Sequence, residues 1–140
     1  MEEENLEGGT SRQVEKSYFS GDFLVVVSYY KKKGVFFMVD TILAKDVLST
    51  AVAQNALVID VRDYESFRKG HIPMAIWMDF EEIKRGNVKI RKNRPLILYC
   101  ERGSTSLLAV KELEKQGYHA VSVIGGFRQY KGPIARNNKF

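Results

Sequence analysis

The feature that most constrains the fold of this chain is a strand–loop–helix pattern in residues 95–116. An apolar run, Leu96–Tyr99, ends at Cys100, and a short loop that contains Gly103 and several hydroxyl residues follows. The apolar positions of Ser106–Gln116 then repeat at the spacing of a helix. A helix N-terminus and loop amides that are directed at one sulfur stabilise a negative charge there. The pattern therefore makes Cys100 a candidate nucleophile.

From residue 41 onward, apolar runs of strand type alternate with short helical patterns. Strands are expected at residues 56–61, 75–78, 96–99 and 120–124, and helices at residues 44–53, 64–69, 80–85, 106–116 and 127–130. Near-continuous apolar strands separated by helices are typical of a mostly parallel sheet with helices on both faces. The predicted fold class is therefore α/β. Ligands of such sheets bind at the carboxyl ends of the strands, which is where Cys100 lies.

The first 40 residues have a different pattern. Residues 1–17 are polar, acidic and glycine-containing, so we expect them to be disordered or loosely held. Phe23–Tyr30 and Val35–Val39 are rich in β-branched and aromatic residues and flank a turn pattern, which predicts a β-hairpin. The chain is thus divided into an N-terminal extension, an α/β domain and a C-terminal tail, at residues 1–40, 41–132 and 133–140.

The amino-acid composition limits the kinds of functional site and of binding partner that the chain can have. The single cysteine excludes an internal disulfide and a cysteine-rich metal site, and it fits a reducing compartment. The acidic N-terminus has no signal-peptide pattern, and no apolar run reaches membrane-spanning length, so we expect a cytoplasmic protein without a membrane partner. The net charge is +5. The preferred interpretation of the clusters of lysine and arginine residues is solvated surface. They lack a nucleic-acid-binding motif, and their field favours small anionic substrates.

Three segments, in this order and spacing, resemble the rhodanese-like family. They are Leu57–Ala75, the loop that begins at Cys100, and Gly125–Phe127 followed by Tyr130, which stands where the family usually has tryptophan. The resemblance covers residues 41–132 and implies a three-layer α/β/α fold and a sulfurtransferase. In this family a cysteine thiolate takes the outer sulfur of a donor such as thiosulfate, carries it as a persulfide, and passes it to cyanide or to a thiol.

The resemblance also assigns roles to residues. Cys100 becomes the catalytic nucleophile, with no metal and no cofactor. Asp60 and Arg62 match an Asp-x-Arg pattern and are expected to form an ion pair that supports the loop. The expected partners are a small anionic sulfur donor such as thiosulfate and an acceptor thiol on a small molecule or a protein, but no nucleic acid. The candidate substrate-binding residues are the rest of the loop: Glu101, Arg102, Gly103, Ser104, Thr105 and Ser106.

Several of these residues have alternative interpretations. Glu101 opposes anion binding if its carboxylate points inward, and we expect it to face solvent instead. Arg102 is either a substrate contact or exposed loop surface. Ser104–Ser106 either donate to a persulfide or cap the following helix. His71 could form a Cys–His dyad, but its Gly-His-Ile-Pro context is typical of a structural turn.

Two other functions compete with sulfur transfer. Phosphatase-like or arsenate-reductase-like relatives of this fold have a loop that is one residue longer and ends in an arginine. Here the loop is Cys100–Thr105, and Ser106 stands at the position of that arginine, which makes these activities less favoured. The stronger alternative is a rhodanese-like binding or regulatory module without catalysis. The intact cysteine and loop argue against it, because such a module needs neither.

Overall fold

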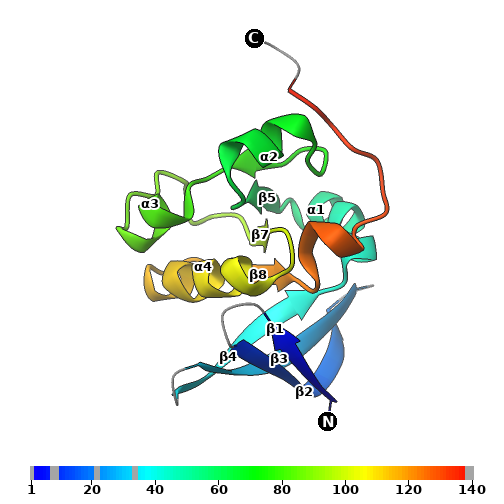
Figure 1. Cartoon of the computed structure of the whole chain (residues 1–140), viewed down its shortest axis with the longest axis vertical. Coiled ribbons are helices and arrows are strands. Elements are labelled where there is room, and N and C mark those ends of the chain that lie inside the picture. The colour runs from blue at the N-terminus through cyan, green and yellow to red at the C-terminus, as the bar shows by residue number, and fades with distance from the viewer. Residues whose placement is uncertain (1, 7–9, 21–22, 33–34, 138–140) are drawn as a thin grey trace.

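The computed structural model describes residues 2–6, 10–20, 23–32 and 35–137 (Figure 1). The strands are β1 (Glu2–Leu6), β2 (Thr10–Ser20), β3 (Phe23–Lys32), β4 (Val35–Ile42), β5 (Leu57–Asp60), β6 (Ile76–Trp77), β7 (Leu96–Tyr99) and β8 (Ala120–Val123). The helices are α1 (Val47–Gln54), α2 (Tyr64–Lys69), α3 (Phe80–Lys84) and α4 (Ser104–Lys115), with 3-10 turns η2 (Ala44–Asp46) and η3 (Gly126–Gln129). Within these residues the strands form one eight-stranded sheet in the order β1-β2-β3-β4-β8-β7-β5-β6.

The sheet combines a parallel part with an antiparallel part. The strands β4, β8, β7, β5 and β6 pair in parallel, and β1 to β4 form an antiparallel meander. The two parts join where Thr41 and Ile42 of β4 pair with Ser122 and Val123 of β8. An α/β fold with a parallel sheet and a β-rich extension is therefore confirmed, and so is the hairpin, now formed by β3 and β4.

The expectation of a disordered start is wrong for the described part of residues 1–17. Residues 2–6 form β1, and residues 10–17 belong to β2. Their polar sequence lacks the apolar alternation that predicts a strand. Backbone pairing of β2 with β3, from Ser11↔Lys31 to Ser20↔Phe23, supplies the order that local sequence does not predict.

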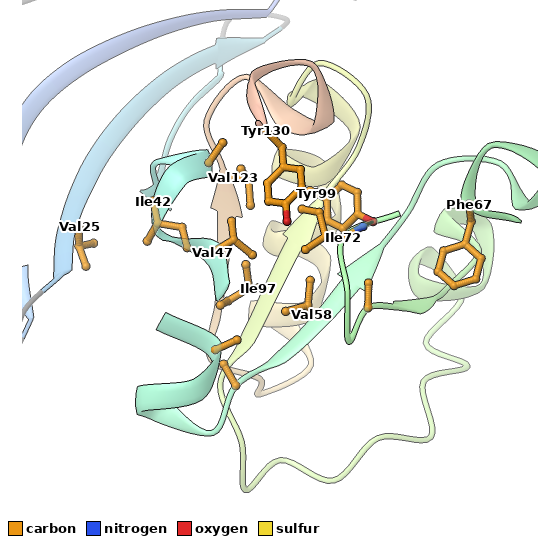
Figure 2. Packing of buried hydrophobic residues seen from close by; sticks show 14 residues of the cluster. Val25, Ile42, Val47, Val58, Phe67, Ile72, Ile97, Tyr99, Val123 and Tyr130 are labelled. Carbon is orange, nitrogen blue, oxygen red and sulfur yellow. Dashed lines mark hydrogen bonds between the residues drawn. The ribbon is translucent and has the colours of Figure 1, made fainter. Parts of the chain in front are cut away.

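Helices cover both faces of the parallel part, and the alternation of side chains along β7 separates the two cores. Ile97 and Tyr99 pack in the core on the α1 side, which also contains Val25 of β3 (Figure 2). Leu96 and Leu98 pack in the core on the side of α3 and α4. Successive residues of a strand point to opposite faces, so one apolar run fills both layers. The result is the predicted three-layer arrangement.

The element bounds follow the sequence pattern closely in the parallel part. The helix Tyr64–Lys69 and the strand Leu96–Tyr99 have the predicted ends. The predicted helix at residues 44–53 is divided into η2 and α1, and α4 begins at Ser104 rather than at residue 106. The tail is held at its start, because the backbones of His71 and Ala135 pair with each other.

No helix in the described part of the chain combines the length and the apolar character that a membrane crossing requires.

Candidate active site

The predicted site residues meet where two neighbouring parallel strands end. Asp60 at the end of β5 is paired with Tyr99 at the end of β7, so the segments that follow these strands lie side by side. They enclose an open pocket of about 320 Å³, which is large enough for a small-molecule substrate. Its lining residues are Val61, Arg62, Asp63, Ser66, Cys100, Glu101, Arg102, Ser104 and Thr105.

The sulfur of Cys100 is held by the backbone of its own loop. The Cys100 side chain is buried, and its Sγ accepts hydrogen bonds from the N–H groups of Gly103 at 3.1 Å and Ser106 at 3.4 Å. These two donors, together with the N-terminus of α4, place partial positive charge around one sulfur atom. The geometry therefore suits a negatively charged sulfur.

The same contacts cap helix α4. Its N-cap residue is Gly103, which has φ 107° and no side chain that could accept a hydrogen bond. The sulfur of Cys100 instead accepts the N–H of Ser106, the bond that a capping side-chain oxygen usually makes. Of the two interpretations of Ser104–Ser106, the N-cap one does not hold, because the N-cap residue is Gly103 and the N–H of Ser106 donates to the Cys100 sulfur.

One buried hydroxyl contacts this sulfur, and a second buried hydroxyl contacts the first. The Cys100 thiol donates to Ser106 Oγ at 3.5 Å, and the Ser106 hydroxyl donates to the carbonyl of Gly103 at 3.2 Å. Ser106 Oγ and Ser122 Oγ, which lies on β8, are 2.8 Å apart. If the thiol loses its proton, the Ser106 hydroxyl can turn toward the sulfur while Ser122 donates to Ser106. The sequence analysis missed Ser122, although a polar residue within the apolar strand Ala120–Val123 was an available signal.

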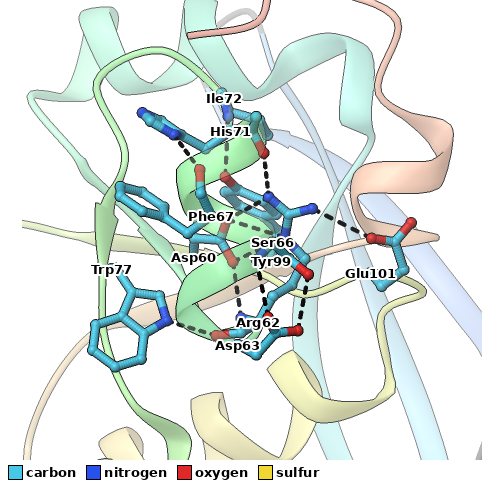
Figure 3. Close-up of polar contacts among 11 residues, drawn as sticks. Asp60, Arg62, Asp63, Ser66, Phe67, His71, Ile72, Trp77, Tyr99 and Glu101 are labelled. Carbon is cyan, nitrogen blue, oxygen red and sulfur yellow. Dashed lines mark hydrogen bonds and ion pairs between the residues drawn. The ribbon is translucent and has the colours of Figure 1, made fainter. Parts of the chain in front are cut away.

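Asp60 and Arg62 form the expected ion pair (Figure 3). Asp60 is fully buried, and its carboxylate accepts hydrogen bonds from the Arg62 guanidinium at 2.8–3.1 Å and from the Arg62 backbone N–H at 2.8 Å. Burial alone would lower the pKa of Arg62, but the hydrogen bonds and attraction from Asp60 outweigh burial and raise this pKa. The guanidinium also lies 4.1 Å from the centroid of the Phe127 ring. Arg62 is therefore a fixed cation.

Arg62 connects this ion pair to the cysteine loop. Its Nη2 donates to the carbonyl of Gly70 at 2.6 Å, and its Nη1 donates to Glu101 Oε1 at 3.3 Å. The Glu101 side chain is 53% exposed. Glu101 thus faces solvent as expected, but it is also tied to Arg62 at the rim of the pocket (Figure 3).

The turn at Gly125 and Gly126, the double-glycine turn, positions residues whose backbone N–H groups donate to the cysteine loop. The N–H of Phe127 donates to the carbonyl of Cys100 at 2.8 Å, and the N–H of Arg128 donates to the carbonyl of Glu101 at 3.1 Å. Gly126 has φ 63°, and a Cβ at this position would lie 2.4 Å from the carbonyl oxygen of Cys100. Only glycine permits so close an approach in this conformation.

His71 serves the structure rather than the pocket. Its ring is stacked on Phe67 with the centroids 3.9 Å apart, and its Nδ1 is 2.7 Å from the carbonyl oxygen of Phe67. His71 is buried and does not line the Cys100 pocket. Within the described residues, no group of three or more His, Cys, Asp or Glu side chains could hold a metal ion.

A cysteine that follows a parallel strand, with its sulfur bound by the amides of the next loop and helix, defines a class of α/β domains with a cysteine loop lined by backbone N–H groups. The rhodanese-like domain model matches residues 43–132, which is more than half of the chain. The chain belongs to the rhodanese-like domain family.

Known proteins with similar sequence or structure agree with this assignment. A thiosulfate sulfurtransferase GlpE of Coxiella burnetii is 32% identical over 89 residues, which cover 61% of this chain and 83% of that protein. A tRNA sulfurtransferase of Desulfurococcus amylolyticus is 29% identical over 61% of this chain, but the match spans 17% of that protein. The crystal structure of a rhodanese-related protein from Thermoplasma volcanium shares the fold, with a TM-score of 0.62 and 24% identity over 68% of this chain and 96% of that one.

Proposed function

We propose that this protein is a sulfurtransferase in which Cys100 carries a sulfane sulfur. The observation that carries the proposal is the Cys100 sulfur, which lines a pocket and accepts hydrogen bonds from two backbone N–H groups. The Cys100 thiolate attacks the outer sulfur of a donor, either thiosulfate or a persulfide. A new S–S bond forms at Cys100, the S–S bond of the donor breaks, and the rest of the donor leaves with the electron pair.

The second half of the reaction needs an acceptor from outside the chain. The chain contains a single cysteine, so no second thiol of the same chain can resolve the persulfide. An external thiolate, or cyanide, attacks the outer sulfur of the persulfide and releases the Cys100 thiolate. The N–H groups of Gly103 and Ser106 can stabilise the negative sulfur in both states.

The remaining predicted site residues take two roles in this proposal. Arg102, Ser104 and Thr105 line the pocket and are proposed to contact the donor. Asp60 and Arg62 support the loop through their ion pair and the contact of Arg62 with Glu101. The chemistry needs no cofactor. We propose a reducing compartment such as the cytoplasm, where the Cys100 thiol stays available.

Mass spectrometry of the intact protein tests the proposal. After incubation with thiosulfate or an alkyl persulfide, we expect a mass increase of one sulfur atom on Cys100, which is removed again by added thiol. The variant Cys100→Ser should stay folded and gain no sulfur. If the folded wild-type protein gains no sulfur from either donor, the proposal is wrong, and a binding module without catalysis becomes the better explanation.

A further inference from the structure

The charged groups at the Cys100 pocket sum to a negative charge when buried Asp60 is counted with its partner Arg62, although the net charge of the chain is +5. Among the described residues that line the pocket, the charged side chains are those of Arg62, Asp63, Glu101 and Arg102. The guanidinium of Arg62 is already neutralised by buried Asp60. With Asp60 counted against Arg62, the other charged groups at the pocket are the carboxylates of Asp63 and Glu101 and the guanidinium of Arg102.

The Glu101 carboxylate is paired with Arg62 at this rim. Its partner Arg62 cannot move freely, because the Arg62 side chain is only 7% exposed and is bound to Asp60 and to the carbonyl of Gly70. The backbone of Glu101 is also held, since its carbonyl accepts the N–H of Arg128 at 3.1 Å. Glu101 directly follows the nucleophile in sequence. Its negative charge thus stays at the rim of the pocket that Cys100 also lines.

From this geometry we infer that Glu101 determines donor specificity, and that it makes a protonated alkyl persulfide a better sulfur donor than thiosulfate. The inference rests on the proposed sulfur transfer at Cys100. It names Glu101 as a specificity-determining residue, while the nucleophile and the sulfur-binding amides stay as proposed.

The two donors differ in the charge that they bring to Glu101. With thiosulfate, the Cys100 thiolate takes the outer sulfur and sulfite leaves as a dianion, so three negative charges are gathered beside Glu101. With a protonated persulfide R–S–SH, the thiolate takes the terminal SH group and R–S⁻ leaves, so the reacting groups carry one negative charge. In a solvent-exposed pocket the additional repulsion amounts to about a tenfold difference in rate.

The test compares two donors in two variants. The second-order rate constants of sulfur loading are measured by mass spectrometry at low ionic strength. The donors are thiosulfate and N-acetylcysteamine persulfide, which is uncharged when protonated. For Glu101→Gln we expect the ratio of the thiosulfate rate constant to the persulfide rate constant to rise about tenfold. High salt should reduce this change, because it screens the carboxylate.

The matched control is Glu65→Gln. Glu65 is an exposed carboxylate paired with Arg68, but it does not line the pocket. Its removal should leave the ratio of the two rate constants unchanged. An unchanged ratio in Glu101→Gln, or an equal change in both variants, would overturn the inference. Absence of loading from both donors in the wild-type protein would instead overturn the proposed function.

Discussion

The segments that follow β5 and β7 begin side by side at the same edge of the sheet, but they use their residues in opposite ways. Where β5 ends, the charged side chains of Asp60 and Arg62 are bound to each other in the interior. After β7, the backbone N–H groups of Gly103 and Ser106 are directed at the Cys100 sulfur. Side-chain charge therefore supports this site, and backbone amides form its centre. Four variants test this difference, from the largest expected effect to the smallest.

Removal of the buried cation should have the largest effect on stability. The variant Arg62→Met leaves the Asp60 carboxylate buried without its partner, so we expect the free energy of unfolding to fall by about 3–5 kcal/mol. Denaturation in urea measures this change. The control Arg68→Met breaks an exposed ion pair with Glu65 and should cost less than about 1 kcal/mol. Equal losses would show that the Asp60–Arg62 pair is no more important than surface charge.

The double-glycine turn should be the next most sensitive position. In Gly126→Ala the new Cβ meets the Cys100 carbonyl in a left-handed backbone conformation, so we expect a loss of about 2–4 kcal/mol and slower sulfur loading. Gly86→Ala is the matched control. Gly86 has φ 80°, but a Cβ added there would have nothing within 4 Å, so only the backbone strain of about 1 kcal/mol should remain. If both variants behave alike, close packing against the loop is unimportant.

A smaller effect is expected when the buried Ser122 hydroxyl is removed. Ser122→Ala removes a hydrogen-bond partner of Ser106, so stability should fall by about 1 kcal/mol. Sulfur loading should slow by about threefold to tenfold, because Ser106 then loses the support it needs to turn toward the sulfur. The exposed Ser49→Ala serves as the control. An unchanged loading rate in Ser122→Ala would show that the backbone N–H groups alone stabilise the negative sulfur.

The smallest effect should come from the first residue of α4. Since the Cys100 sulfur occupies the capping position, Ser104→Ala should change stability by less than about 0.5 kcal/mol. Asp79→Ala offers the contrast, because the Asp79 side chain caps α3 by accepting the N–H of Glu81. That variant should cost about 1 kcal/mol. A loss of similar size for Ser104→Ala would show that its hydroxyl has a capping role.

The sequence predicts the parallel part of the fold well because its signals are local. The run Leu96–Tyr99 is apolar at every position, and the helix Tyr64–Lys69 begins after a capping aspartate and ends before Gly70. Neither β1 nor the first part of β2 has such a pattern. Their order comes from pairing with neighbouring strands, which no local signal reveals.

The site shows the same division between local and long-range information. The strand–loop–helix pattern alone identifies Cys100 and the amides that follow it. The position of Glu101 depends on Arg62, which lies 39 residues away in the sequence, and the contact of Ser106 with Ser122 spans 16 residues. Such contacts are fixed by how the strands are ordered in the sheet. Sequence reasoning could therefore name the loop residues and the solvent-facing side chain of Glu101, but not the contact of Glu101 with Arg62 or that of Ser106 with Ser122.

The antiparallel strands β1 to β3 also change which strand lies at the edge of the sheet. With β4 paired to both β3 and β8, the outermost of the described strands on this side is β1, in which Glu2, Glu3 and Glu4 follow one another. The backbone of an outermost strand can recruit a strand from another molecule and so start aggregation. Like charges that face each other across two strands weaken the pairing, and the sequence of β1 is acidic. The added strands thus end the sheet on a segment that resists self-association, whereas the apolar β4 would invite it.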